Sequence, residues 1–333
     1  MTMQDARTEQ DLLIETFDGR ARRRDNRRAF FTAALGAAAV GSAFAYADPA
    51  LAQTSVTDSD VLNFALNLEY LEAQFYLYAV NGSGLSSDLT ASGSGTAGGT
   101  VIGGAPVTFT DDPLVGAYAR EIAADELAHV KFLRTALGTA AVAMPNINIS
   151  GDANGPFTAA ARAAGVVDKT TGIFNPYASP TDFLLGAFIF EDVGVTAYKG
   201  AAPLLSNKTF LEAAAGILAV EAYHAAIVRT TLYSKGVQGL IDATELIAAA
   251  RDSLDGAPAE DKVRGIGPVD DQGIKPSGSD DTLTANLSPL NSNGLAFSRT
   301  PGQVLNIVYL NAGTATMGGF FPNGVNGNIK STT

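Results

Sequence analysis

The feature that most constrains this chain is a short motif, Glu-x-x-His, which occurs once at Glu126 and His129 and again at Glu221 and His224. On a helix this spacing leaves the carboxylate and the imidazole on one face, about one turn apart. The chain has only two histidines, and both belong to this motif. A single such pair is common on helix surfaces, but two pairs that use every histidine indicate a shared polar site inside a helical bundle.

Each Glu-x-x-His motif follows a helix that carries a glutamate near its middle. Glu69 precedes Tyr76 by seven residues, and Glu191 precedes Tyr198 by the same spacing, which returns to the same helical face. The order on four successive helices is therefore Glu, Glu-x-x-His, Glu, Glu-x-x-His. Glu72 is the rival of Glu69, and we prefer Glu69 because it alone has the matching tyrosine.

Apolar periodicity and capping residues predict these four helices at residues 60–80, 112–137, 179–205 and 207–234. We expect Asp58 and Ser59 to cap the first helix. The other predicted starts are Asp112 with Pro113, Ser179 with Pro180, and either Asn207 or Thr209.

The segments between the helices are rich in glycine and polar residues. Residues 81–110 are predicted to form a long surface loop, with a short hairpin between Val101 and residues 107–109. The alternative is that this segment acts as a lid or as a partner-binding loop. Residues 138–180 are predicted to form a long crossover that contains a short helix at 158–164. Two further helices are expected at 240–254 and 301–310, with irregular chain between them.

Composition limits the chemistry. The net charge of −12 argues against nucleic acid as a partner, because binding phosphates requires basic patches. Without cysteine the chain cannot form disulfides, iron–sulfur clusters or thiolate metal sites. A transition metal must therefore be bound by histidine and carboxylates, a ligand set that suits iron, manganese or zinc.

The first 52 residues resemble a twin-arginine export signal. Arg27 and Arg28 precede two phenylalanines and a short run rich in alanine and glycine, with a cleavage site after Ala52 and an earlier option after Ala47. The run is too short and too weakly apolar to span a membrane stably. We expect removal of residues 1–52 and a periplasmic or secreted location; an uncleaved anchor or a basic amphipathic terminus is the alternative.

The ligand order resembles that of the ferritin-like superfamily across residues 58–235. The resemblance implies an all-α fold, a four-helix bundle with a long crossover between its second and third helices. Residues 296–310 and 318–323 also resemble the bacterial and plant desiccation-related branch. The expected organisation is a signal region at 1–52, the bundle at 53–236 with its Gly/Ser-rich insert, and a partly irregular extension at 237–333.

The resemblance also implies two divalent metal ions, iron or manganese, bound close together. Four carboxylates and two neutral imidazoles suit two such ions about 3.5–4 Å apart. Two 2+ ions would neutralise the four carboxylates. By resemblance Glu126 and Glu221 are bridging ligands, Glu69 with His129 and Glu191 with His224 are terminal ligands, and Tyr76 and Tyr198 either bond ligand carboxylates, take part in redox chemistry or are ordinary core aromatics.

A ligand histidine needs an acceptor for its second ring N–H. Asp125 resembles the family aspartate that bonds the histidine of the opposite half, here His224. Val220 takes the equivalent position before Glu221 and cannot accept, so the two halves are not equivalent. Asp192 is our candidate acceptor for His129. Both aspartates could instead be solvated acids on a helix face.

Three functions suit such a site. The first is an oxidoreductase of small oxygen species, either a ferroxidase using O₂ or peroxide, or a catalase-like enzyme. The second is metal sequestration without turnover. The third is a structural role in desiccation or stress, with the metals stabilising the bundle. A storage cage fits less well, because the insert and the long C-terminal region do not resemble a compact cage subunit.

Overall fold

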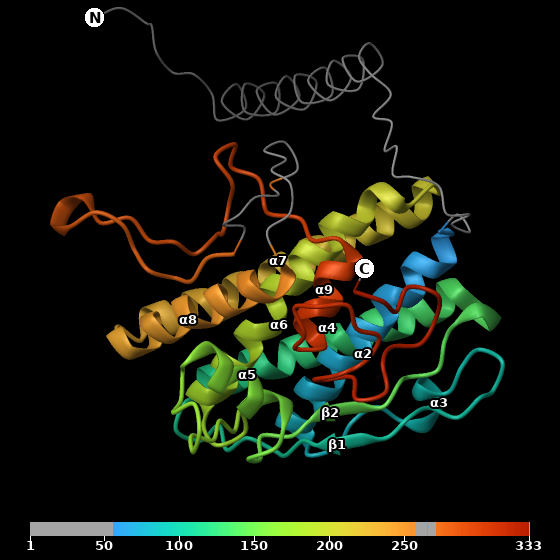
Figure 1. Ribbon diagram of the computed structural model, residues 1–333, viewed down its shortest axis with the longest axis horizontal. Coiled ribbons are helices and arrows are strands. Elements are labelled where there is room, and N and C mark those ends of the chain that lie inside the picture. Colours follow the sequence, from blue (N-terminus) through green and yellow to red (C-terminus); the bar gives the residue numbers. More distant parts are fainter. Residues whose placement is uncertain (1–55, 257–264, 266–270, 333) are drawn as a thin grey trace, which may run out of the picture. The chain divides into compact units, whose positions relative to one another are not determined.

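The computed structural model describes residues 56–256, 265 and 271–332, and four long helices dominate this part of the chain. They are α2 (Asp58–Asn81), α4 (Pro113–Leu137), α6 (Pro180–Ala201) and α7 (Lys208–Ser234). α2 packs along α4, and α6 packs along α7; the two pairs meet through α2 against α6 and α4 against α7 (Figure 1). The predicted all-α bundle with a long crossover is confirmed. The predicted signal region lies outside the described residues.

Three of the four helices begin at a predicted cap. Asp112 accepts a hydrogen bond from the amide of Val115, and the Ser179 hydroxyl accepts one from the amide of Asp182. Asn207, rather than the alternative Thr209, caps α7. These side chains satisfy amide groups that have no partner within the helix.

The start of α2 differs from the prediction. Thr57 is the N-cap, and its hydroxyl accepts from the Asp60 amide while the Asp60 carboxylate accepts from the Thr57 amide at 2.9 Å. This reciprocal pair forms a capping box, which satisfies two amides together. Asp58 instead accepts a hydrogen bond from the amide of Ser206 at 2.8 Å, which joins the start of α2 to the start of α7.

The insert after α2 contains α3 (Ser87–Thr90) and β1 (Val101–Gly103). β1 pairs in parallel with β2 (Ile147–Ile149), with Val101 opposite Ile147. The predicted hairpin is therefore wrong. The partner strand comes from the crossover, beyond the whole of α4, and turn residues near β1 carry no signal of so distant a pairing.

The crossover contains η1 (Gly138–Ala140), β2 and α5 (Pro156–Ala164), which confirms its predicted short helix. An aromatic cluster fixes this segment to the bundle. Phe75 of α2 lies 5.5 Å from the rings of both Phe157 and Phe183, and Phe190 lies 4.9 Å from Phe320. Each of these rings is buried, so the cluster joins α2, α5, α6 and the C-terminal segment through apolar contact.

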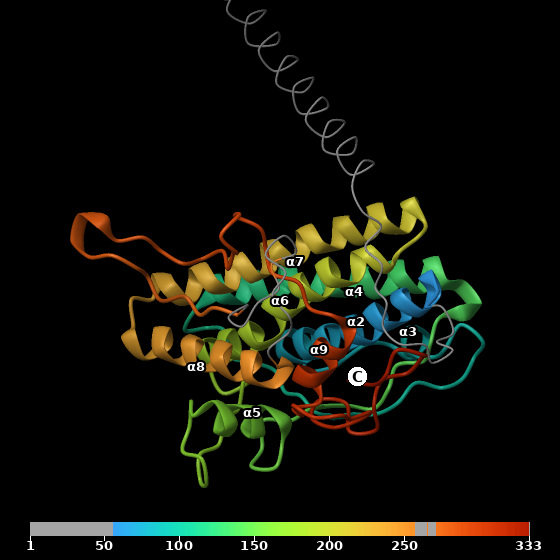
Figure 2. The same cartoon turned by 45° about the horizontal axis from the view of Figure 1, so that its top comes forward.

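After η2 (Ala202–Leu204) and α7, the chain forms α8 (Gln238–Asp255), η3 (Asp280–Thr282) and α9 (Pro301–Val308). α9 packs against α6 and α8. The last segment then returns across α2, red over blue in Figures 1 and 2. There the Asn67 amide group donates to the carbonyl of Asn326 at 2.8 Å and accepts from its amide at 3.0 Å.

A buried network of ion pairs joins α8 and the C-terminal segment to the bundle. Asp192 of α6 accepts from Arg229 of α7 at 2.8 Å and from Arg251 of α8 at 2.9 Å. Asp271 accepts from Arg251 at 2.7 Å and from Arg299 at 2.8 Å. Arg299 also donates to Asp255 at 2.6 Å. Three arginines therefore meet three aspartates, and the charges balance inside the protein.

Among the described residues one helix, α7, is long and apolar enough to cross a membrane by length and composition. It is a bundle helix, and its Glu221 and His224 are buried. A bundle helix with an apolar inner face passes the same test, so this is weak evidence for a membrane span.

Candidate metal centre

The structure brings all six predicted ligands together in the middle of the bundle. α2 and α6 each supply one glutamate, and α4 and α7 each supply one Glu-x-x-His motif. α2 and α6 are buried on nearly all sides, so their acids lie far from water. None of the six is more than 8% exposed: Glu69, Glu126, His129, Glu191, Glu221 and His224.

His129 directs Nδ1 into a group of carboxylates. This nitrogen lies 3.2 Å from Glu69 Oε2, 3.6 Å from Glu126 Oε2 and 3.7 Å from Glu221 Oε1. Three helices therefore contribute a carboxylate around one imidazole nitrogen.

His224 forms the second half of the cluster. Its Nδ1 lies 3.1 Å from Glu126 Oε1 and 3.5 Å from Glu191 Oε2. The two imidazole rings are 6.3 Å apart, centre to centre. Glu126 therefore reaches both histidines, one with each carboxylate oxygen.

The ligand atoms form two groups that could each hold a metal ion. Glu69, Glu126, His129 and Glu221 form the first, and Glu191, Glu221 and His224 form the second. Within each group one atom of every residue lies within 4.8 Å of the others. Glu221 belongs to both groups, which places the two positions side by side.

Six polar atoms of this cluster lack hydrogen-bond partners. Both carboxylate oxygens of Glu126 and of Glu221, Oε2 of Glu191 and Nδ1 of His224 are buried and make no hydrogen bond. The 3.1 Å contact between His224 and Glu126 is close enough for an ion pair but lacks the angles of a hydrogen bond. Buried polar atoms without partners are costly. Divalent cations would satisfy all of them, so the residues fit the implied metals.

Burial and the charges of neighbouring side chains shift the pKa values of the clustered glutamates and histidines. Burial and the neighbouring Glu126 raise the pKa of Glu69 to about 7, and they raise the pKa of Glu221 well above its usual value. Burial also acts to raise the pKa of Glu126, but its close contacts with both histidines lower it to about 2. Despite burial, the adjoining carboxylates raise the pKa of His129 to about 10 and that of His224 to about 12.

Two tyrosines hold the terminal carboxylates across the bundle. Tyr76 of α2 donates to Glu191 of α6, and Tyr198 of α6 donates to Glu69 of α2. Burial and these carboxylates raise the pKa of both tyrosines well above the usual value, so both remain donors. Each tyrosine therefore supports the glutamate of the other half.

The two predicted aspartates have different roles. Asp125 Oδ2 lies 3.1 Å from His224 Nε2, where it can orient the ring that presents Nδ1 to the carboxylates. The prediction that Asp192 orients His129 is wrong. Asp192 points away from the cluster and accepts hydrogen bonds from Arg229 and Arg251 instead. Its neighbour Glu191 occupies the inner face, and adjacent helix positions face different sides.

Glu72 also faces the cluster, in addition to Glu69. Its side chain is buried, and burial together with Glu126, Glu191 and Glu69 raises its pKa well above the usual value. Glu69 and Glu72 are therefore not alternatives, because their spacing of three residues puts both on one face of α2. A fifth glutamate therefore borders the site, and its surroundings favour the protonated form.

Comparison with known proteins agrees with this geometry. The sequence model of the ferritin-like domain matches residues 57–234, which include all four helices of the bundle and all six clustered residues. The chain belongs to the ferritin-like domain family. This ferritin-like chain thus carries its buried carboxylate and histidine cluster in the part that defines the family.

Two curated relatives cover most of this ferritin-like chain. The ferritin-like catalase Nec2 of Nesocodon mauritianus is 28% identical over 279 residues, 82% of this chain and 84% of the relative. The desiccation-related protein PCC13-62 of Craterostigma plantagineum is 28% identical over 262 residues, 75% of this chain and 76% of the relative. These relatives support the desiccation-related branch of the family. No solved structure matches the chain.

Gly194 is a residue of this ferritin-like centre that the sequence reasoning missed. It lies on α6, one turn after Glu191, and its missing side chain leaves room for the Glu221 carboxylate. A Cβ atom there would collide with Glu221 Oε2 and lie 3.5 Å from Glu72 Oε1. The available signal was a glycine in the middle of a mostly apolar helix, which often has a packing reason.

We expect Gly194→Ala to displace Glu221 and to weaken metal binding at least tenfold, a loss of about 1.4 kcal/mol. Gly216→Ala is the matched control, because Gly216 lies on the exposed face of α7 and an added Cβ would meet nothing within 4 Å. The control should bind metal normally and gain roughly 0.5–1 kcal/mol of stability. Metal titration monitored by calorimetry measures both. Equal metal affinity in the two variants would contradict this role of Gly194.

Metal binding is expected to release at least two protons, one from each histidine. Their raised pKa values, about 10 and about 12, keep both imidazoles protonated at neutral pH without metal. A ligand nitrogen must lose its proton, so metal affinity should fall as the pH falls. Calorimetric titration in two buffers of different ionisation enthalpy counts the protons. Binding without proton release would show that the histidines do not coordinate.

Proposed function

We propose that this protein binds two iron or manganese ions through Glu69, Glu126, His129, Glu191, Glu221 and His224 and acts on peroxide or O₂. The observation that carries the proposal is the set of buried, unpartnered ligand atoms on Glu126, Glu191, Glu221 and His224. Both metals accept carboxylate and imidazole ligands. When bound, such ions would supply the redox chemistry that no side chain of this cluster has.

The chain's own residues prepare the site for that chemistry. Tyr76 and Tyr198 hold the two terminal glutamates, and Asp125 orients His224. Burial of α2 and α6 limits bulk water around the cluster, which strengthens electrostatic interactions inside it. Burial and the neighbouring glutamates raise the pKa of Glu72 well above its usual value, which favours a proton on Glu72 beside the ligands.

Peroxide disproportionation is the reaction that we favour, because the relative Nec2 is a ferritin-like catalase. Two molecules of hydrogen peroxide would give two of water and one of O₂. Oxidation of Fe(II) by O₂ or peroxide is the alternative reaction of the same site. We also propose export through the twin-arginine pathway, supported by Arg27 and Arg28 and by the cleavage pattern at Ala52.

The test is to load the purified protein with manganese or iron and to follow O₂ release from peroxide and O₂ consumption with Fe(II). Glu126→Ala is the inactive variant, and Glu212→Ala on the exposed face of α7 is the control. Turnover that depends on Glu126 but not on Glu212 is expected. Turnover that survives in Glu126→Ala would remove the site assignment.

A non-catalytic role in desiccation or stress is the second candidate. It is favoured by the relative PCC13-62, a desiccation-related protein with the same identity to this chain as Nec2. In that case the metals would stabilise the bundle, or the protein would sequester them. Full metal loading without turnover of peroxide or Fe(II) would favour this candidate.

A further inference from the structure

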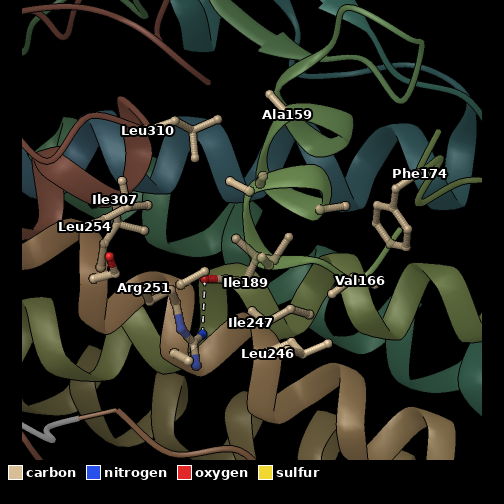
Figure 3. A pocket seen from close by; sticks show the side chains of 17 residues that line it. Ala159, Val166, Phe174, Ile189, Leu246, Ile247, Arg251, Leu254, Ile307 and Leu310 are labelled. Atoms are coloured by element: carbon tan, nitrogen blue, oxygen red, sulfur yellow. Dashed lines mark hydrogen bonds between the residues drawn. The ribbon is translucent and has the colours of Figure 1, made fainter. Parts of the chain in front are cut away.

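A pocket of about 400 Å³ opens at the surface between α5 and α8. Figure 3 shows side chains of α5, α6, α8 and α9 around it, including the labelled Ile189 and Ile307. Its outer lining includes the exposed residues Ala159 and Leu246, so the pocket reaches solvent. Apart from Arg251 and Ser253, the lining side chains are apolar.

The charge of Arg251 is already neutralised, so it does not make this a site for an anion. Its guanidinium donates to Asp192 and Asp271 and to the carbonyl oxygen of Phe188 at 2.5 Å. It also lies over the Phe188 ring, 4.7 Å from the ring centre. The pocket therefore presents mainly apolar surface to whatever enters it.

A second cavity of about 20 Å³ lies deeper, between α2, α6 and α9. Ile189 and Ile307 line both cavities, so these two side chains lie between them. The lining of this inner cavity is apolar, with Leu68, Phe190 and Phe320 among its residues, except where it ends at Glu72.

The inner cavity reaches the metal centre. Gly194 lines it, and the position that a Cβ of Gly194 would take is in contact with Glu221 Oε2 and 3.5 Å from Glu72 Oε1. Gly194 therefore borders both this cavity and the carboxylate of Glu221, the residue shared by both ligand groups.

We propose that the outer pocket, the junction at Ile189 and Ile307, and the inner cavity form an apolar path for dioxygen to or from the metal centre. The proposal rests on the proposed function, since O₂ is the product of peroxide disproportionation and the oxidant of Fe(II). In either reaction O₂ must pass between the helices that enclose the cluster, and this path would take it between α2 and α6.

The lining selects for a small apolar molecule. A polar solute in the inner cavity would lose its hydrogen bonds to water, and of the side chains there only Glu72 could replace them. Apolar cavities of this kind stay dry and bind inert gases. Water, peroxide and metal ions have a more suitable approach on the α4–α7 side, where the Asp125 side chain is 43% exposed beside His224.

Krypton-pressurised crystals locate such a path without any reaction. We expect krypton in the outer pocket and in the inner cavity beside Phe190 and Phe320. In Ile307→Phe, which fills the junction, we expect the outer site to remain and the inner site to be lost. Krypton absent from the inner cavity of both the unmodified protein and Ile307→Ala, which widens the junction, would overturn the proposal.

The rate of reaction with O₂ gives the second readout. Iron-loaded, reduced protein is mixed with O₂ at several concentrations in a stopped-flow instrument. Ile307→Phe should lower the O₂-dependent rate several-fold, and Ile307→Ala should leave it unchanged or raise it, while metal content stays at the unmodified level. Ile241→Phe is the matched control, because Ile241 is a buried α8 residue outside both cavities. An unchanged rate in Ile307→Phe would overturn the proposal.

The two readouts separate this path from the proposed function. If the protein binds no metal, the proposed function fails, and the krypton positions still decide whether the path exists. If the protein binds metal and reacts with O₂, but krypton stays outside and Ile307→Phe reacts normally, the path fails alone.

Discussion

Removal of both metals is expected to lower the free energy of unfolding more than any single substitution does. A metal present at a thousand times its dissociation constant stabilises the fold by about 4.1 kcal/mol, so two contribute about 8 kcal/mol. Without metal, Glu69 and both histidines keep raised pKa values. Groups with raised pKa values lose their stabilising contribution as the pH rises. The contribution of Glu69 to stability is therefore lost as the pH rises from 4.5, its ordinary pKa, through about 7, its pKa in the folded protein.

Calorimetric unfolding with and without a chelator measures this difference across that pH range. The metal-free protein should become less stable as the pH rises through about 7, as Glu69 ionises. The metal-loaded protein should lack this dependence, because its ligands are already deprotonated. Identical unfolding curves with and without chelator would show that bound metal does not stabilise the bundle.

Glu221→Gln separates the metal-free protein from the metal-loaded protein, because only the metal-loaded protein should be destabilised by this substitution. Burial and four neighbouring acids raise the pKa of Glu221 well above the usual value, so a neutral amide suits the metal-free core at least as well. The variant should be as stable as the unmodified protein without metal, and more stable at high pH, yet lose most of the stabilisation by metal. Glu212→Gln, exposed on the same helix, should change neither.

Arg299→Met is expected to destabilise the protein by about 3–5 kcal/mol, the usual cost of leaving a buried ion pair half occupied. The substitution keeps much of the side-chain volume but removes the hydrogen bonds to Asp255, Asp271 and the Thr196 hydroxyl. Arg299 is 1% exposed, so water cannot replace it. The effect should be visible in denaturant unfolding.

Arg120→Met provides the control for this substitution. Arg120 lies exposed on α4, where a change from arginine should alter stability by no more than roughly 0.5 kcal/mol. Metal content should stay at the unmodified level in both variants, because neither arginine contacts the ligand cluster. A loss in Arg299→Met no larger than in the control would show that the buried network contributes little.

The bundle and its inward-facing acids were predictable, because helical periodicity and ligand spacing are local properties of the sequence. Glu69 and Glu191 repeat their relation to Tyr76 and Tyr198, and that repeat located the polar face of α2 and α6. The crossed hydrogen bonds, with each tyrosine serving the opposite glutamate, were not predictable, since they depend on how α2 packs against α6.

The failed predictions concern contacts between distant segments. The strand pairing of Val101 with Ile147 and the ion network of Asp192 both join parts of the chain that no local pattern connects. Asp192 was the candidate acceptor for His129, but its side chain binds Arg229 of α7 and Arg251 of α8 instead. The role of Gly194 also depends on a distant contact, because only the packed structure reveals that the Glu221 carboxylate occupies the space beside this glycine.

The most direct test of the two-metal site is the metal content of the purified protein, measured by elemental analysis beside Glu126→Ala and His224→Ala. We expect two iron or manganese ions per chain in the unmodified protein and less than one in each variant. Stoichiometric metal retained in both variants, or no metal bound by the unmodified protein after loading, would contradict this expectation.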